Sequence, residues 1–233
     1  MGDAIVKNIV KSYGKGKAKI YANNDISFTI KEGELAIIVG PSGAGKSTIL
    51  NILGGMDKPD SGEIIVDGID ISKATDKELT EYRRYKIGFV FQFYNLINNL
   101  TALENVELAA QIVENSIPAD EILRQVGLGD RMNNFPSQLS GGEQQRCSIA
   151  RALAKNPSIL LCDEPTGALD YRTGKQILKL LQDTARKSKT SVVIITHNTA
   201  ITPIADRVIE IWDAKVRNIT ENKNPMDIDD LEW

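Results

Sequence analysis

The segment that most constrains this chain is GPSGAGKS, residues 40–47, which fits the pattern G-x-x-x-x-G-K-[ST]. It follows the apolar segment ELAIIV and precedes STILNIL, whose apolar residues have helical spacing. A glycine-rich turn between a buried strand and a helix holds phosphates, because its backbone N–H groups and the helix N-terminus both face the anion. The segment therefore predicts an α/β fold in which a strand, a loop and a helix form a nucleotide-binding site.

The residue types of this loop each supply something that a triphosphate needs. Gly40, Gly43 and Gly45 let the backbone turn tightly with its N–H groups inward. Lys46 is expected to reach the β- and γ-phosphates, and the hydroxyl of Ser47 is a suitable ligand for Mg²⁺. We therefore predict ATP and Mg²⁺ as cofactors. Further ATP contacts are expected from Pro41, Ser42, Ala44 and Thr48.

Composition narrows the class of protein. The 233 residues are 42% apolar and 25% charged, which is ordinary for one globular domain. A net charge of −3 gives no bulk attraction to nucleic acid, and no apolar run approaches the roughly 20 residues that cross a bilayer. The N-terminus lacks the layout of a secretion signal, so we expect a cytoplasmic protein without direct membrane insertion. Cys147 and Cys162 lie in apolar segments and are expected to be core thiols.

Short apolar runs alternate with helical patterns along the chain, which predicts a mainly parallel sheet beside an antiparallel β subdomain. The stretch 95–137 has helical periodicity and no convincing strand. We therefore expect one domain at residues 1–220 with a helical subdomain at approximately 93–150. The polar, acidic tail at 221–233 is expected to be loosely ordered. The expected strands cover residues 4–10, 25–30, 35–39, 63–66, 87–91, 159–162, 192–196 and 207–212.

A second helix start suited to an anion is predicted in LSGGEQQR, which begins at Leu139. Ser140 and Glu143 have the S-x-x-E spacing of a capping box. Gly141 and Gly142 leave the first turn open to a ligand. Taken alone, this pattern favours an ordinary capped helix.

Polar side chains also follow three apolar strands. Asp163 and Glu164 end the segment ILLCDE, and paired carboxylates at the end of a parallel strand suit metal and water chemistry. Gln92 follows IGFVF, and its amide could bind a metal or water or simply end the strand. His197, the only histidine, follows SVVIIT directly. A solvated strand end remains the alternative for the two carboxylates.

Together these segments resemble the ABC ATPase family over nearly the whole chain. LSGGE matches the signature motif of that family, with the phosphate loop upstream and the paired acids downstream. The resemblance implies that Ser140, Gly141, Gly142 and Glu143 contact the γ-phosphate of ATP held by a partner subunit. Two copies of the chain would then enclose two ATP molecules as a homodimer.

The resemblance also implies roles within one subunit. Asp163 would hold Mg²⁺ through water, Glu164 would orient or deprotonate the attacking water, and His197 would contact the γ-phosphate. Gln92 would ligate Mg²⁺ or bind the water, and Asp170 would lie in a subunit-contact turn. The resemblance further implies that Tyr13 stacks on adenine, because it matches the position of an aromatic residue that does so in the family. The alternative is that Tyr13 is a surface tyrosine.

Several longer strings narrow the resemblance to the macrolide-exporter and lipoprotein-release (MacB/LolD) type, which implies export, extrusion or mechanical work at the cell envelope. Because no membrane region is fused before Trp233, we expect a separate permease that holds the chain at the cytoplasmic face of the plasma (inner) membrane. FYNLI, residues 93–97, could fill a permease groove or pack in the core. Arg83, Arg84 and Lys86 are expected to form a solvated charged face. The strings are GGMDKPDSGEI, FQFYNLINNLTALENVELA, FPSQLSGGEQQR and EPTGALD.

Two other functions are compatible with a phosphate loop. ABC-type ATPases that act on DNA or ribosomes usually have paired cassettes, coiled coils or basic arms, which this sequence lacks. A regulator without turnover would not need Lys46, Asp163, Glu164 and His197 together. The transported substrate is left open by the sequence.

Overall fold

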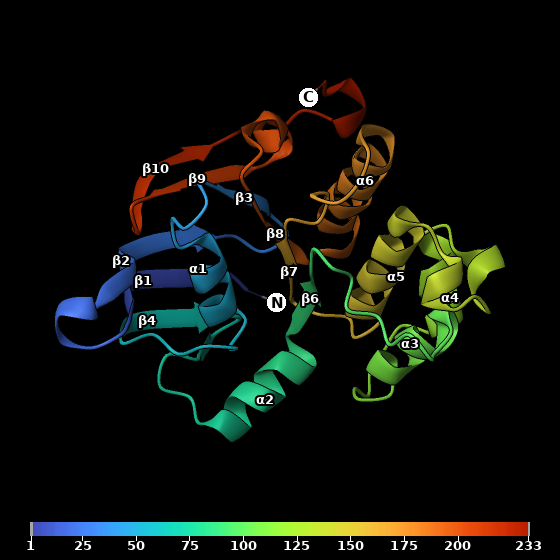
Figure 1. Ribbon diagram of the computed structural model, residues 1–233, viewed down its shortest axis with the longest axis horizontal. Helices are drawn as coiled ribbons and strands as arrows, with labels where there is room; N and C mark the ends of the chain where they lie inside the picture. The colour runs from blue at the N-terminus through green and yellow to red at the C-terminus, as the bar shows by residue number, and fades with distance from the viewer. Residues whose placement is uncertain (1, 233) are drawn as a thin grey trace.

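Two β-sheets of different pairing form the frame of the molecule, for which a computed structural model describes residues 2–232 (Figure 1). The smaller sheet has the order β2-β1-β4-β5 and is antiparallel. The larger has the order β10-β9-β3-β8-β7-β6 and is parallel except for the edge pair β10–β9. The strands are β1 Ala4–Tyr13, β2 Ile20–Ile30, β3 Leu35–Val39, β4 Ser61–Val66, β5 Ile69–Asp70, β6 Ile87–Val90, β7 Ile159–Asp163, β8 Ser191–Thr196, β9 Arg207–Trp212 and β10 Lys215–Glu221.

Helices cover the parallel sheet on one side, and α1 fills the space between the two sheets. In Figure 1, α3, α4 and α5 lie together at the opposite end of the molecule from β1, β2 and β4. The α-helices are α1 Lys46–Leu53, α2 Asp76–Tyr85, α3 Ala102–Ala110, α4 Ala119–Gln125, α5 Gly141–Leu153 and α6 Tyr171–Ser188. The 3-10 helices are η1 Gly16–Ala18, η2 Gly129–Arg131, η3 Pro136–Gln138, η4 Thr199–Ile204 and η5 Ile228–Asp230. None of these helices in residues 2–232 is long and apolar enough to span a bilayer.

The central strand β3 shows how the two cores are divided. All five of its residues are buried, because both faces of the sheet are covered. Leu35 and Ile37 belong to the apolar cluster that includes residues of α5 and α6, whereas Ala36 and Ile38 belong to the cluster that includes α1 and the antiparallel sheet. This alternation is the two-residue period of a strand. It places the loop that follows Val39 at the junction of both cores.

Three helices begin with the same reciprocal cap. Thr75 with Glu78, Thr101 with Glu104, and Ser140 with Glu143 each satisfy two backbone N–H groups that a helix start would otherwise leave unpaired. The S/T-x-x-E spacing marks all three starts, although the same spacing at Thr29 and Glu32 does not begin a helix. The predicted cap at Ser140 is thus confirmed.

The strand prediction was largely confirmed, with two omissions. Every expected strand is present, and residues 95–137, all within the described chain, contain helices and no strand. The short strand β5 and the edge strand β10 were not predicted, because β5 has only two residues and β10 is mostly exposed and polar. Both cysteines are free and buried, as expected, and burial raises the pKa of Cys147 to about 11. The division into a domain and a helical subdomain remains an interpretation.

The C-terminal tail is docked, so the expectation of loose order was wrong. Ile228 and Leu231 are buried in the cluster that includes α6 residues. The backbone N–H of Ile228 donates to Gln182 Oε1 (3.1 Å), and Gln182 Nε2 donates to the carbonyl of Met226 (2.9 Å). These two apolar residues lie within a polar, acidic segment, so its average composition does not reveal that it packs against α6. Trp233, at the end of this tail, lies outside the described residues.

The basic residues at the end of α2, Arg83, Arg84 and the following Lys86, make more contacts than the expected solvated charged face. Arg83 donates to the carbonyl of Gly55 (2.5 Å), and Lys86 pairs with Asp67 (2.5 Å). Arg84 Nε donates to the carbonyl of Ile112. These side chains tie α2 to its surroundings while keeping partial contact with solvent.

Candidate functional site

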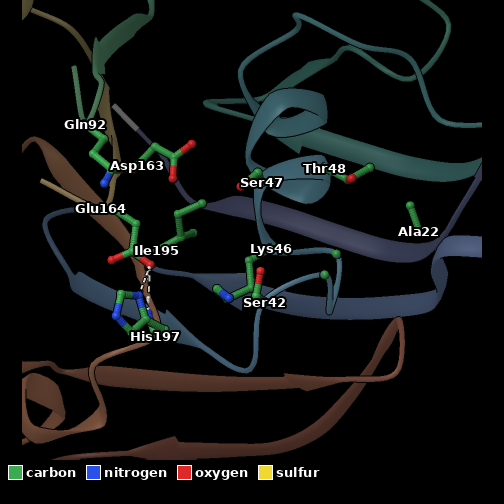
Figure 2. Close-up of a pocket in the computed structure, with 12 residues that line it drawn as sticks. Ala22, Ser42, Lys46, Ser47, Thr48, Gln92, Asp163, Glu164, Ile195 and His197 are labelled. Carbon is green, nitrogen blue, oxygen red and sulfur yellow. Dashed lines mark hydrogen bonds and ion pairs between the residues drawn. The ribbon is translucent and has the colours of Figure 1, made fainter. Parts of the chain in front are cut away.

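The predicted catalytic residues meet in one pocket of about 430 Å³ at the carboxyl edge of the parallel sheet. Figure 2 shows Gln92, Glu164 and His197 at one end of this pocket, Lys46 and Ser42 near its middle, and Thr48 with Ala22 at the other end. The pocket is lined by Ala22, Ser42, Gly43, Gly45, Lys46, Ser47, Thr48, Gln92, Asp163, Glu164, Ile195 and His197. Gly40, Pro41 and Ala44 belong to the same loop without lining the pocket. The elongated arrangement suits a ligand with a charged end and a less charged end.

The phosphate loop is packed so tightly that glycine is required. A Cβ built on Gly45 would lie 2.0 Å from the carbonyl oxygen of Ala22, and the residue has a φ of 98°. Either feature alone would make any side chain at this position costly in free energy. Gly45 then caps α1, so the first N–H groups of that helix face the pocket. The loop therefore has the anion-binding geometry that its sequence predicts.

Lys46 lies inside the loop with its ammonium held in place. Its Nζ donates to the carbonyls of Gly40 (2.7 Å) and Pro41 (2.9 Å), and the residue is only 8% exposed. Burial lowers the pKa of Lys46, while Glu164 and Asp163 act in the opposite direction. The ammonium is therefore held at the loop, close enough to Glu164 and Asp163 for their charges to act on it.

Asp163 and Glu164 occupy different environments although they are neighbours. Burial raises the pKa of Asp163, the charge of Glu164 raises it further, and Lys46 lowers it. Glu164 has a left-handed backbone with φ of 46°, which turns its side chain away from the line of β7. Its carboxylate accepts from Thr196 Oγ1 (2.9 Å) and from the backbone N–H of His197 (2.9 Å).

His197 completes this hydrogen-bonded group. Its Nδ1 lies 2.8 Å from Glu164 Oε1, as the dashed lines in Figure 2 show. The imidazole therefore has one nitrogen fixed against the carboxylate, and the other is available to the pocket. Glu164 is held from one side by β8 and the residue that follows it, so its position depends on two strands of the sheet.

Two residues that support the site were missed from the sequence. Thr196 ends β8 and holds Glu164, and its place directly before His197 was the available signal. Gln145 on α5 is fully buried and donates from Nε2 to the carbonyl of Pro165 (2.9 Å). A polar residue on the buried side of a helix was the signal for Gln145. It ties the helix that begins at Ser140 to the loop after Glu164.

The signature residues lie outside this pocket. Ser140 Oγ and its backbone N–H donate to the carboxylate of Glu143 (2.8 Å each), and Glu143 also pairs with Arg131 (3.2 Å). A Cβ on Gly142 would lie 2.2 Å from Cγ2 of Thr173, so the first turns of α5 and α6 are in close contact. These two turns form one surface that does not reach the pocket within the same subunit.

The remaining predicted residues fall at three places. Gln92 lines the pocket, and its Nε2 is 3.2 Å from where a Cβ of Gly167 would stand. Asp170 caps α6 by accepting from the N–H of Thr173 (3.1 Å). Tyr13 does not line the pocket, but its hydroxyl contacts Thr48, which does. It is thus beside the less charged end of the site.

The donor set fits Mg²⁺ bound together with phosphates. Ser47, Gln92 and Asp163 bring a hydroxyl, an amide and a carboxylate to one pocket, all of them oxygen ligands that Mg²⁺ prefers. The pKa of Asp163 is raised by burial and by Glu164, so a nearby cation would relieve an unfavourable negative charge. Among residues 2–232 there is no cluster of three or more acidic, histidine or cysteine ligands.

The phosphate loop, the paired carboxylates and the parallel sheet define a P-loop nucleotide-hydrolysing protein. Residues 23–167 match the family model described as ABC transporter. The ATP-binding protein MJ0796 of Methanocaldococcus jannaschii is 48% identical over 220 residues, which cover 91% of this chain and 94% of that protein. The chain belongs to the ABC transporter family and is an ATP-hydrolysing subunit that powers a transporter.

Two further comparisons support the fold and the branch. The dimeric structure of the MJ0796 cassette in a post-hydrolysis state bound to ADP and Pi has a TM-score of 0.86 at 43% identity, covering 95% of this chain and 99% of that one. The macrolide export ATP-binding/permease protein MacB of Bartonella quintana is 44% identical over 91% of this chain, which spans 33% of that protein. An ATPase acting on DNA or ribosomes is not favoured, because these relatives are transporter proteins.

Proposed function

We propose that this chain hydrolyses Mg²⁺-ATP in composite sites between two copies of itself. The observation that carries the proposal is the division of the predicted residues into two separate surfaces. Lys46, Glu164 and His197 share one pocket, whereas Ser140 and Gly142 lie on a helix start outside it. A second subunit, turned head to tail, would bring its helix start to the open side of the pocket.

Within the pocket, each side chain has a task that its contacts support. Lys46 would bind the β- and γ-phosphates in place of the two loop carbonyls. Glu164, fixed by Thr196 and His197, would accept a proton from the attacking water, and such general base catalysis contributes about 10²- to 10⁴-fold to a rate. His197 would hold the γ-phosphate with the nitrogen that Glu164 does not use.

Mg²⁺ would be held by Ser47, by Gln92 and, through water, by Asp163. Bound there, the ion neutralises charge that develops on the phosphates during transfer. Asp163 would orient the water shell of the ion, and the bound cation would favour its ionised form against the burial that raises its pKa. Ser42, Gly43 and Thr48 would complete the contacts to ATP, together with Gly40, Pro41, Ala44 and Gly45 of the same loop, and Tyr13 would stack on the base.

The signature turn would act on the partner's nucleotide. Ser140 and Glu143 hydrogen-bond each other and hold the turn. The backbone N–H groups of Gly141 and Gly142 would then bind the γ-phosphate. Asp170 caps the adjacent helix start and would lie in the same contact. The dimeric ADP- and Pi-bound structure of the MJ0796 cassette supports this arrangement.

A separate permease would dock beside Gln92. Phe93 is 77% exposed directly after this pocket residue, whereas Leu96 packs on the core, so FYNLI serves both purposes. Because Phe93 is the residue next to Gln92, a permease that binds Phe93 could shift the side chain of Gln92 in the pocket. The MacB relative, in which ATP-binding and permease functions are joined, supports a permease as partner, and this partner would hold the chain at the cytoplasmic face of the membrane.

Mixing two inactive variants tests the composite site. Lys46→Ala removes the phosphate contact of one pocket, and Ser140→Arg blocks one signature turn. If sites are shared, mixed subunits form heterodimers in which one site has both wild-type halves, and phosphate release rises above that of either variant alone. Activity equal to the mean of the two variants at every mixing ratio would contradict shared sites.

A further inference from the structure

The phenol of Tyr13 is held by a network on the side away from the phosphate loop. Its hydroxyl donates to Asp57 Oδ2 at 2.7 Å, across 44 residues of sequence. Lys11 donates to Asp57 Oδ1 at 2.6 Å and lies over the Tyr13 ring, with Nζ 5.1 Å from the centroid. The ring is therefore fixed at its tip and covered on one face.

Asp57 is placed by the segment that follows α1. Its backbone N–H donates to the carbonyl of Asn51 (3.3 Å), which turns the chain back along that helix. Its carboxylate also accepts from the backbone N–H of Lys58 (2.7 Å). The segment that follows α1, the helix that begins at the phosphate loop, thus supplies the residue that holds the tyrosine.

The charges in this network keep each group in its binding form. Burial acts to raise the pKa of Asp57, but hydrogen bonds from Lys11, Tyr13 and Lys58 outweigh it and leave the pKa lowered. Burial and the neighbouring Asp57 carboxylate raise the pKa of Tyr13. At neutral pH the phenol is therefore a donor to an ionised acceptor, and such charge-assisted hydrogen bonds are the stronger kind.

We propose that Asp57 is a positioning residue for the base of ATP, acting through the phenol of Tyr13. The proposal rests on the proposed function, in which Tyr13 stacks on the base. Tyr13 is 48% exposed and lies at the end of β1, where a free ring would sample several rotamers. Asp57 selects one of them. Lys11 occupies one face of the ring, so the other face receives the base beside Thr48.

Pre-organising the ring contributes to affinity because its ordering cost is met before ATP arrives. Ordering one side chain on binding corresponds to about two- to tenfold in a binding constant. Loss of the whole ring removes base stacking, which corresponds to roughly 5- to 150-fold. The effect of Asp57 should be the smaller and should vanish once the phenolic hydroxyl is gone.

Titration with ATP and with inorganic tripolyphosphate tests this role. Tripolyphosphate has three phosphates and neither base nor ribose, so it reports the phosphate loop alone. We expect Asp57→Ala and Tyr13→Phe each to weaken ATP binding by about two- to tenfold, the ordering cost of one side chain, and to leave tripolyphosphate binding unchanged. The double variant should bind ATP no more weakly than either single variant. In turnover, KM should rise while kcat stays the same.

Asp60 provides a matched control. It lies three residues further on and hydrogen-bonds Ser12 of the same strand, through the backbone N–H (2.8 Å) and Oγ (2.5 Å), without bonding the phenol. Asp60→Ala should leave the ratio of ATP to tripolyphosphate affinity unchanged. An equal loss in Asp57→Ala and Asp60→Ala would assign a general structural role and overturn the proposal.

Other outcomes separate this inference from the proposed function. If Tyr13→Ala lowers the affinity ratio but Asp57→Ala does not, Asp57 has no positioning role and base stacking stands. If Tyr13→Ala leaves the ratio unchanged, base stacking by Tyr13 and the role of Asp57 both fail. Fully additive losses in the Tyr13→Phe/Asp57→Ala variant would also overturn the proposal, because the two residues would act independently.

Discussion

Replacing Gly142 with alanine tests how closely the first turns of α5 and α6 pack. The added Cβ would stand 2.2 Å from Cγ2 of Thr173, far inside the contact distance of two carbon atoms, and 3.7 Å from its Oγ1. Only the methyl group of Thr173 is therefore in the way. Thr173→Ser removes this methyl and keeps the hydroxyl, so it is the matched second change.

Two opposing effects set the magnitude. Overpacking of this kind costs about 1–3 kcal/mol, whereas alanine is favoured over glycine within a helix by up to about 1 kcal/mol. We expect Gly142→Ala to lower the free energy of unfolding by about 1–2 kcal/mol in the wild-type background. In the Thr173→Ser background the same change should be neutral, or stabilising by up to about 1 kcal/mol. The sign of the effect thus depends on one methyl group.

Chemical denaturation of the four proteins at equilibrium, without nucleotide, measures this coupling. Low protein concentration keeps subunit association out of the result. A stability change of the same size for Gly142→Ala in both backgrounds would refute the packing argument. ATPase activity is a separate readout and need not recover in the double variant, because the proposed contact with the partner's ATP is also altered.

Three further changes have expected outcomes. Glu164→Gln should lower kcat by about 10²- to 10⁴-fold with ATP affinity nearly retained, as measured by phosphate release and equilibrium binding; wild-type turnover would remove Glu164 from catalysis. The pKa of Glu143 is lowered from 4.5, mainly by the hydrogen bond from the Ser140 N–H. Its charge therefore stabilises the fold fully above pH 4.5, and this contribution is lost as pH falls through the lowered pKa. Urea unfolding should therefore show Glu143→Gln less stable by about 0.5–1 kcal/mol at pH 7 and equal to wild type in strong acid; a constant difference would contradict this linkage. Leu231→Ala should cost about 2–5 kcal/mol, whereas Glu232→Ala should change stability by less than about 0.5 kcal/mol; equal midpoints would mean that the tail contributes no packing.

Local patterns predicted much of the fold because their causes are local. The phosphate loop and the cap at Ser140 depend on residues within a few positions of one another, and both formed as expected. The antiparallel strand β10 escaped prediction because its stability comes from pairing with β9 rather than from its own apolar residues. A pattern search has little to detect in an exposed edge strand.

Most residues that line the pocket were predicted from the sequence, but their geometry was not. The sequence identified Glu164 and His197, yet the left-handed backbone at Glu164 and its bond to Thr196 follow from how two strands end side by side. The contact between Asp57 and Tyr13 joins distant segments, so no local spacing of residues could have predicted it. In each case the sequence does not show which residue from a distant segment becomes the neighbour in the folded structure.

The docked tail has a practical consequence for anyone who labels or shortens this protein. One amide, that of Gln182, is hydrogen-bonded at the same time to the backbones of Ile204, Met226 and Ile228. Cutting the chain before Met226 would leave an apolar socket on α6 open to solvent, inviting aggregation. For measurements of stability, a dye or affinity handle is better attached at the exposed β1–β2 turn, away from the docked tail. For measurements of nucleotide binding, it is better attached after Glu232, away from Tyr13.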